Sequence, residues 1–413
     1  MRKLLYFVPE FPGQTHSFFW REALAIRDLG LDVRFGSTRL PMGGYGRHDW
    51  CLSACRETVY AVSRQTFSPG HWLQLIRLNW SRLYGLCNHI ASCQDFDKKQ
   101  RLTLFRNLFL AVFYGARLKK EQIDHIHSHF QFSGCDLICF VSQLYKINYS
   151  ISRHSANYDA YNLAMKWSHA SFGLVVTQTM LVELKREHPN LSIPLYVASM
   201  GVDTSYFRRD KDYRISRSTN IHLRFVACSR LNPSKGYPIV LTVLAALARE
   251  GHSFDYIILG EDEKGGSGYH AKLQENIDKL NLTDRVKLLG SSSQETVKAH
   301  LEDAHVFLLP SYDEAIGAAF MEAMAMELPV VAAAVGGVPE LIQDGKTGYL
   351  VKPNDSESIM VLLRSFFEDT SSLKNIGRQA RRQIEENFLP QKRYATFIKA
   401  LGYPEVFGER PNE

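Results

Sequence analysis

The segment HLRFVACSRLNPSKGYPIVLTVLAALARE (222–250) contains the structural unit that decides the fold. Apolar residues dominate 222–229, a turn with Pro233 and Gly236 follows, and apolar residues then recur at helical spacing up to residue 249. A buried strand that feeds a loop and a helix is the repeating unit of a doubly wound parallel sheet. The segment therefore predicts an α/β fold.

The same alternation continues through the second half of the chain. It predicts strands at 222–229, 254–260, 285–289, 305–309 and 329–333, and helices at 236–249, 269–280, 294–302, 318–326 and 355–368. Regular alternation of short apolar runs with helical patterns is typical of a parallel sheet covered by helices.

The first half follows this pattern less regularly. It predicts strands at 3–9, 32–35, 124–130, 149–155 and 172–178, with a helix that ends near Gly30. Residues 41–70 mix Gly, Pro and aromatic residues without a period, which predicts an irregular insertion, and the polar segment from residue 200 predicts an interdomain linker. We therefore expect two doubly wound, Rossmann-like domains that face each other across a cleft, over 1–200 and 201–386.

Length and composition limit the function classes. A chain of 413 residues is too long for one ordinary core, and 45 % apolar with 22 % charged residues is typical of globular proteins. The net charge of +6 fits an anionic small molecule, a pyrophosphate lipid or a membrane surface as well as nucleic acid. Seven cysteines without a C-x-x-C pair favour neither a disulfide framework nor a zinc site. With no signal-peptide core and no run of 18 apolar residues, the sequence predicts a cytoplasmic protein.

Residues 71–120 predict two amphipathic helices, the second of which allows two interpretations. Leu102, Phe105 and Phe109 lie on it among Arg and Lys side chains. The stripe can pack into the core, or it can lie on a membrane surface, because an interfacial helix needs a basic face beside Phe and Leu. Both interpretations stay open, and the second would place the protein at the cytoplasmic face of a membrane.

Two cations follow the strand at 222–229. Arg230 comes at its end and Lys235 lies at the entrance to the next helix. Ligands bind at the carboxyl ends of strands in open α/β sheets, and a helix N-terminus there favours phosphate. The alternative is that both cations only pair with local carboxylates.

Two carboxylates follow the strand that ends near Pro310. Glu314 and Glu322 are eight residues apart, so on one continuous helix they would lie about 80° apart and could face the same cleft. A Glu322 buried among apolar neighbours needs hydroxyl groups or cations, which a ribose or hexose would supply. The small residues of 315–318 leave backbone N–H groups approachable for pyrophosphate or sugar oxygens. The alternative for Glu322 is a solvated helix face.

The segment PSYDEAIGAAFMEAMAMELPVVAAAVGGVPELIQDGKTGYLV (310–351) resembles the donor-site motif of glycosyltransferase family 4, retaining enzymes of the GT-B fold. The glutamates match its Glu-x7-Glu motif, and the resemblance implies that Glu322 binds ribose and Glu314 the transferred sugar. It further implies that Arg230 and Lys235 hold the donor diphosphate and that GEDE (260–263), with Glu261, lies near the donor. Donor contacts at Ala315, Ile316, Gly317 and Ala318 follow from the same motif.

The sequence departs from the family where Ala315 and Ile316 follow the first glutamate, since the family usually has Gly and then an aromatic residue or Leu. If the backbone at residue 315 needs a positive φ, Ala is strained there by roughly 1 kcal/mol or more. In that case either the loop is adjusted or the choice of donor is altered. Independently of the backbone angle, the methyl group of Ala315 is expected to crowd the sugar.

The N-terminal half matches the family more loosely. The segment FPGQTHSFFWREALAIRDLG (11–30) is similar to the opening of a subgroup that builds bacterial exopolysaccharide and colanic-acid-type units, although Gln14 and His16 break the pattern. The resemblance implies that Gly13 faces the donor phosphates and that His154, with Asp159, lines the acceptor side. His127 and His129 are expected on the cleft wall. A terminal helix over 387–413, with a stripe of Phe388, Tyr394, Phe397 and Leu401, is expected to cross back onto the first domain and form part of a hinge.

The resulting prediction is a metal-independent hexosyltransferase without a cofactor. It takes a nucleoside-diphosphate sugar and a glycan or lipid-linked acceptor, and it does not bind nucleic acid. No D-x-D pair stands at a strand end, so Arg, Lys and helix N-termini are expected to neutralise the leaving group. The resemblance implies front-face attack, in which the leaving phosphate takes the acceptor proton. Three alternatives stay open: a sugar-nucleotide epimerase, a phosphorylase, and a non-catalytic subunit that binds nucleotide-sugar.

Overall fold

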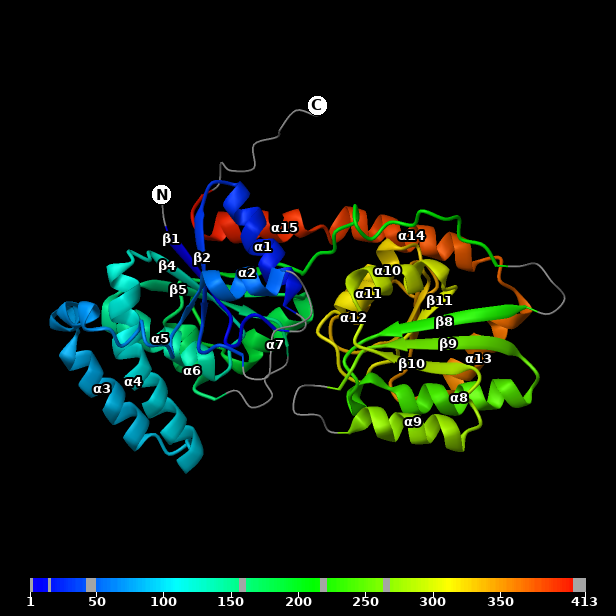
Figure 1. Cartoon of the computed structure of the whole chain (residues 1–413), viewed down its shortest axis with the longest axis horizontal. Coiled ribbons are helices and arrows are strands. Elements are labelled where there is room, and N and C mark those ends of the chain that lie inside the picture. Colours follow the sequence, from blue (N-terminus) through cyan, green and yellow to red (C-terminus); the bar gives the residue numbers. More distant parts are fainter. Residues whose placement is uncertain are drawn as a thin grey trace. The chain divides into compact units, whose positions relative to one another are not determined.

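The computed structural model describes residues 3–13, 16–41, 50–155, 161–215, 221–262 and 268–403. The chain folds into two compact units (Figure 1). The first comprises Met1–Ala198 together with Tyr394–Glu413, and the second comprises Ser199–Arg393. The first unit is therefore assembled from both ends of the chain, with its last part beginning seven residues after the expected start at 387.

A sheet of seven parallel strands forms the centre of the first unit, in the order β3-β2-β1-β4-β5-β6-β7. The strands are β1 (Lys3–Phe7), β2 (Asp32–Ser37), β3 (Thr58–Tyr60), β4 (His125–His129), β5 (Asn148–Arg153), β6 (Gly173–Val175) and β7 (Leu195–Val197). The chain order reverses between β1 and β4, which pair directly. This reversal is the mark of a doubly wound sheet.

Helices cover this sheet. They are α1 (Ser17–Asp28), α2 (Trp50–Glu57), the 3-10 helix η1 (Pro69–Arg77), α3 (Trp80–Ser92), α4 (Lys98–Lys120), α5 (Ser133–Tyr145), α6 (Leu163–Ser168), α7 (Gln178–Glu187) and α15 (Pro390–Ala400). Phe19 and Ile26 of α1 lie on one helical face and share a core with Tyr6 of β1 and Phe397 of α15. The last helix is thus part of the same core as the first strand.

The prediction of irregular structure for 41–70 is wrong for 50–60, where α2 and β3 form, and for 69–70, where η1 begins. It is right for 61–68, which are bends and turns, while 42–49 lie outside the described residues. Within 50–60, α2 buries Cys51 and Ala54, and β3 adds a short edge strand with Val59 in the core. Two small buried side chains and a three-residue strand give only a weak periodic signal, which explains the error.

The second unit contains a sheet of six parallel strands in the order β10-β9-β8-β11-β12-β13. The strands are β8 (His222–Cys228), β9 (Ser253–Leu259), β10 (Val286–Gly290), β11 (Val306–Leu308), β12 (Val330–Ala333) and β13 (Tyr349–Val351). The helices are η2 (Pro233–Lys235), α8 (Tyr237–Arg249), α9 (Tyr269–Lys279), α10 (Gln294–Asp303), α11 (Ala318–Ala325), α12 (Val338–Leu341), α13 (Ser356–Glu368) and α14 (Leu373–Asn387).

The five strands and five helices predicted for this half begin and end within one residue of the observed elements. Together with the first sheet, they confirm two parallel-sheet, Rossmann-like α/β units. The sequence analysis missed four elements of this unit: η2, α12, β13 and the amphipathic α14.

The segment after residue 200 is not a free linker. Phe207 and Tyr213 are buried in the core of the second unit, with 1 % and 5 % of their surface exposed. Arg381 of α14 donates hydrogen bonds to the carbonyl oxygens of Thr204 and Phe207 at 3.2 and 3.1 Å. The described part of this segment, up to residue 215, therefore packs as a strap on its own unit.

The predicted apolar stripe of the last helix is divided between two cores. Phe388, just after α14, packs in the core of the second unit, whereas Phe397 and Leu401 pack in the core of the first. Residues 404–413 lie outside the described residues. Within the described residues, we found no helix that combines the length and the apolar character required to cross a bilayer.

Candidate active site

The strand order of the second unit marks the place where a ligand is expected. The chain winds outward from β8 in one direction through β9 and β10, and in the other through β11, β12 and β13. The order therefore reverses between β8 and β11, and open α/β sheets bind ligands outside the carboxyl ends of the strands at such a switch point. Lys235 lies in the loop after β8, and Glu314 in the loop after β11.

Lys235 and Glu314 are in direct contact across this switch point. The Lys235 Nζ donates a hydrogen bond to the Glu314 Oε1 at 2.5 Å. The two side chains are only 12 % and 14 % exposed, so solvent screens this ion pair less than it screens a surface pair. The residues are 79 positions apart in the sequence, so the carboxylate partner of Lys235 comes from a distant segment of the chain.

Main-chain contacts hold the two loops against each other. The Tyr312 N–H donates to the Ser234 carbonyl oxygen at 2.6 Å. Gly236 has a φ of +73°, and a Cβ atom there would lie 2.3 Å from the Pro310 carbonyl oxygen. A side chain at residue 236 would therefore separate the loops that carry Lys235 and Glu314.

The loop after β12 supports Glu314 from the other side. Gly336 has a φ of +50°, and a Cβ atom there would lie 1.9 Å from the Glu314 carbonyl oxygen. The next residue, Gly337, donates its N–H to the Ala315 carbonyl oxygen at 3.0 Å. The backbone of Glu314 is thus fixed by neighbours on both sides.

Glu322 reaches the same edge of the sheet from α11. Glu322 is half-buried. Burial of the Cys228 thiol raises its pKa to about 12, and the negative charge of Glu322 adds to this effect. Cys228 is the last residue of β8, so the Glu322 carboxylate lies near the carboxyl end of that strand. Glu314 precedes α11 (Ala318–Ala325) and Glu322 lies on it, in agreement with the helix predicted over 318–326. One carboxylate comes from a loop and the other from a helix.

Arg230 and Glu261 lie on neighbouring loops of this edge. Both are exposed, and Arg230 comes two residues after the end of β8. The Leu231 N–H donates to the Glu261 carbonyl oxygen at 2.9 Å, which joins the loop after β8 to the loop after β9. Glu263, the last residue of the predicted GEDE loop, lies outside the described residues.

The N-terminus of α11 follows Glu314 directly. Gly317 caps it with a φ of +88°, and a Cβ atom at this residue would lie 2.2 Å from the Phe320 ring. Ile316 is fully buried, whereas Ala318 is exposed at the first turn. The first N–H groups of a helix have no partner within the helix, and the positive end of its dipole favours an anion.

The condition under which Ala315 would be strained is not met. Ala315 is not among the described residues with a positive φ, and the glycines at 317 and 336 take the left-handed conformations of this region. The loop thus accommodates alanine because the unusual backbone angles fall on other residues.

Ala315→Gly is therefore expected to lower the free energy of unfolding by about 0.4 to 1 kcal/mol, because glycine adds conformational freedom to the unfolded chain without relieving strain. Chemical denaturation of both proteins measures the difference. A variant more stable than the parent would show that Ala315 is strained after all.

In the first unit, Gly13 and His154 follow β1 and β5, at the carboxyl ends of their strands. Gly13 is half-buried and accepts a hydrogen bond from the His16 N–H at 3.1 Å. His154 Nε2 lies 3.0 Å from His129 Nδ1, and only 7 % of His154 is exposed. Gln14, Thr15 and Asp159 lie outside the described residues, so the expected place of His154 and Asp159 on the acceptor side stays a prediction.

The H-x-H pattern of β4 belongs to a buried polar ladder. His127 is fully buried, and its two ring nitrogens lie 2.7 and 2.9 Å from the hydroxyl groups of Ser150 and Ser152 on β5. His129 is fully buried as well, so neither ring forms the cleft wall that the sequence led us to expect. Among the described residues, no group of three or more His, Cys, Asp or Glu could hold a metal ion.

Comparison with known proteins identifies the family. The profile described as "Glycosyl transferases group 1" matches residues 211–383. The chain is 33 % identical to the "Putative colanic acid biosynthesis glycosyltransferase WcaL" of Escherichia coli (strain K12), over 97 % of this chain and 100 % of that protein. The chain belongs to the group 1 glycosyltransferases. A second relative, the amylovoran biosynthesis glycosyltransferase AmsK of Erwinia amylovora, is 30 % identical over 50 % of each chain.

Solved structures agree with this assignment at the level of the fold. The structure of Anabaena Alr3699/HepE in complex with UDP and glucose has a TM-score of 0.71 and 18 % identity, and the match covers 97 % of this chain and 100 % of that chain. A glycosyltransferase from Rickettsia africae ESF-5 has the same TM-score with 16 % identity and covers 99 % and 100 %. This glycosyltransferase therefore has the GT-B fold.

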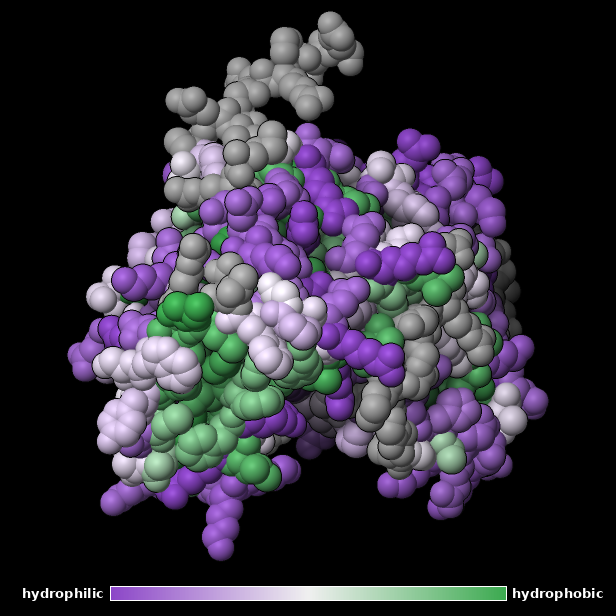
Figure 2. All heavy atoms as spheres, turned by 60° about the vertical axis from the view of Figure 1, so that its left-hand side comes forward, coloured by the Kyte–Doolittle hydropathy of each residue, from purple (hydrophilic) through white to green (hydrophobic). Residues whose placement is uncertain are grey.

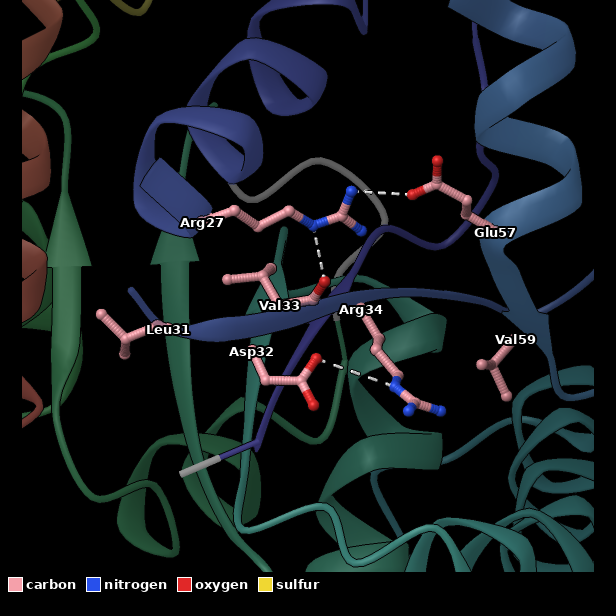
Figure 3. Close-up of a pocket in the computed structure, with 7 residues that line it drawn as sticks. All are labelled: Arg27, Leu31, Asp32, Val33, Arg34, Glu57 and Val59. Carbon is pink, nitrogen blue, oxygen red and sulfur yellow. Dashed lines mark hydrogen bonds and ion pairs between the residues drawn. The ribbon is translucent and has the colours of Figure 1, made fainter. Parts of the chain in front are cut away.

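A separate cavity of about 340 Å³ lies in the first unit, at the edge of the sheet opposite to the carboxyl ends of its strands (Figure 3). It is lined by Arg27, Leu31, Asp32, Val33, Arg34, Glu57 and Val59. Arg27 donates to the Val33 carbonyl oxygen and to Glu57, both at 2.8 Å. The cavity is at the start of β2, away from the carboxyl ends of the strands, and its arginines are already paired, so it is a poor candidate for the active site of this glycosyltransferase.

The sequence analysis missed the glycines and main-chain contacts that build the candidate site. Gly336 and the main-chain hydrogen bond between Tyr312 and Ser234 position Glu314. Neither involves a side chain that would identify it in the sequence. The signal that could have found Gly336 is the Gly-Gly pair before PELI, because paired glycines after a buried strand often mark a close approach of backbones.

Proposed function

We propose that this glycosyltransferase moves a hexose-type sugar from a nucleoside-diphosphate sugar to a glycan or lipid-linked acceptor, with retention of the anomeric configuration. The observation that carries the proposal is the contact between Lys235 and Glu314 at the switch point of the second sheet. A cation and a carboxylate at one point suit a donor that has a diphosphate at one end and sugar hydroxyls at the other.

Two findings on other proteins support the donor class and the pathway. HepE has been solved with UDP and with UDP-glucose, and its fold is shared by this chain. WcaL and AmsK are named for colanic acid and amylovoran biosynthesis. We therefore propose a role in polysaccharide or glycoconjugate biosynthesis.

In the proposed donor complex, Arg230, Lys235 and the N-terminus of α11 bind the diphosphate. Glu314 and the backbone of 315–318 bind the transferred sugar, Glu322 binds the ribose hydroxyls, and Glu261 lies near the donor. Positive groups that are fixed before the reaction stabilise the charge that develops on a leaving phosphate, so no metal ion or other cofactor is required by the proposal.

The proposed reaction exchanges one glycosidic bond for another. The bond between the anomeric carbon and the diphosphate oxygen breaks, and the acceptor hydroxyl attacks the same face of the sugar. Its proton passes to the leaving phosphate. Gly13 and His154 would contribute from the first unit, Gly13 beside the donor phosphates and His154 beside the acceptor.

A screen of nucleotide-sugars with the purified protein tests the reaction type. We expect one donor to be consumed with release of nucleoside diphosphate and to yield a product with the anomeric configuration of the donor, as read by NMR. Conversion of the sugar without an acceptor would indicate an epimerase, and dependence on free phosphate would indicate a phosphorylase. An inverted product would reject retention.

Glu322→Ala is expected to weaken nucleoside diphosphate binding about 10- to 100-fold, because each hydrogen bond to a charged group contributes about 1.5 to 3 kcal/mol. Calorimetry with uridine and guanosine diphosphates measures the change. Glu275→Ala is the matched control, since Glu275 pairs with Lys279 on the exposed face of α9 in the same unit. Equal affinities of the parent and Glu322→Ala would remove Glu322 from the ribose site.

A further inference from the structure

The helices η1, α3 and α4, inserted between β3 and β4 of the first unit, carry an exposed apolar surface. Of fifteen large apolar side chains that are exposed in the described residues, eight lie between residues 62 and 109. We name seven of them the hairpin face: Trp72, Ile76, Trp80, Tyr84, Leu102, Phe105 and Phe109. Figure 2 shows apolar side chains gathered on the side of the molecule that carries α3 and α4.

The hairpin face is separate from the residues that pack these helices onto the fold. Leu104 and Leu108 of α4 are buried, as are Leu86 and Ile90 of α3, and both helices contact α5. Leu102 lies on a different face of α4 from Leu104 and Leu108, and it is 72 % exposed. Packing therefore explains one side of each helix and leaves the hairpin face unexplained, whereas single exposed apolar residues would need no explanation.

The same stretch carries the positive charge of the protein. Residues 58–120 contain ten Lys or Arg and two Asp, a local net charge of +8, whereas the whole chain carries +6. The remaining residues are therefore slightly acidic. Lys98, Lys99 and Arg106 are exposed on α4, three or four residues from Leu102 and so on the same side of the helix.

Aromatic residues of the hairpin face suit the boundary between lipid and water. Trp72 and Trp80 are 56 % and 64 % exposed, while Tyr84 is 70 % exposed. Trp and Tyr are enriched at membrane interfaces because their rings are apolar and their N–H and O–H groups can stay hydrated. Lys and Arg in the same surface are attracted to anionic headgroups.

We propose that the hairpin face docks this protein onto the surface of a membrane that contains anionic lipid. Apolar side chains enter the headgroup region, and the basic residues beside them contact lipid phosphates. The charge favours this occupant over a second copy of the chain, because two such faces would bring two strongly positive surfaces together.

Sedimentation with vesicles tests the proposal on the full chain. We expect binding to vesicles of phosphatidylcholine with phosphatidylglycerol, weaker binding to phosphatidylcholine alone, and loss of binding at high salt. The double variant Phe105→Ser/Phe109→Ser and the charge-reversal variant Lys98→Glu/Lys99→Glu are each expected to lower the partition coefficient about tenfold or more. Val361→Ser, at an equally exposed apolar residue of α13, is expected to bind like the parent.

Two further measurements distinguish docking on lipid from misfolding of the variants and from self-association. Unchanged thermal unfolding and unchanged nucleoside diphosphate affinity in both variants would show that the fold and the proposed donor site are intact. The proposal would be overturned if the parent protein did not bind anionic vesicles, or if the variants bound them as well as the parent does. A parent dimer that Phe105→Ser/Phe109→Ser dissociates in analytical ultracentrifugation would assign the hairpin face to a second copy instead.

Discussion

Lys235→Ala is expected to lower kcat/KM for sugar transfer about 10²- to 10³-fold, the effect typical of removing one fixed group that stabilises developing negative charge. The variant removes a cation from the switch point of the second sheet and leaves Glu314, only 14 % exposed, without the partner it has at 2.5 Å. Both changes disfavour an anionic donor, because the site loses a positive charge and keeps a negative one.

Steady-state kinetics with the donor found by the screen measure this effect. Lys279→Ala is the matched control, since Lys279 pairs with Glu275 in the same unit but both partners are largely exposed. An exposed pair of this kind contributes at most about 1 kcal/mol to stability, so the control should keep its activity. If Lys235→Ala turns over within about threefold of the parent, the diphosphate is not held at this point.

Gly336→Ala is expected to lower the free energy of unfolding by about 2 to 4 kcal/mol, as overpacking adds to backbone strain. The added Cβ would stand 1.9 Å from the Glu314 carbonyl oxygen, so the loop carrying Glu314 must shift. A shift of about 1 Å in a positioned group can cost about 100-fold in turnover, so the variant should lose transfer even where it stays folded.

Gly345→Ala separates the two causes. Gly345 also has a positive φ, +68°, but a Cβ atom there would have no other atom within 4 Å. Gly345→Ala should therefore lower the free energy of unfolding only by the backbone strain, about 1 to 2 kcal/mol, and the variant should keep its activity. Denaturation and kinetics of both variants give the comparison, and equal losses in the two would contradict a contact between Gly336 and the Glu314 loop.

The second unit was more predictable than the first because its strands and helices alternate without interruption. Buried strands such as β12 (Val330–Ala333) are continuously apolar, and helices such as α8 begin after a Pro or Gly turn. In the first unit, short elements with small buried residues, such as α2 around Ala54, give little periodic signal. The helices inserted between β3 and β4 also interrupt the regular alternation of strands and helices in this unit.

At the candidate site, the side chains with strong chemistry could be predicted, but their supports could not. Lys235 and Glu314 stand out in the sequence as charges beside buried strands, and the structure joins them. Which residue has the unusual backbone angle could not be read from the motif, because a positive φ was considered for Ala315, whereas Gly317 and Gly336 have it. The histidines of β4 were similarly ambiguous, because a buried ladder with Ser150 and Ser152 and an exposed wall share the same H-x-H pattern.

The division of the chain has a consequence for the order in which the protein can fold during synthesis. Phe397 and Leu401 share a core with Leu4, so the first unit needs residues from both ends of the polypeptide. The second unit uses only Ser199–Arg393, so its core can form without Phe397 and Leu401. We expect the later-encoded unit to reach its native state first, while the unit that begins the chain waits for the final helix.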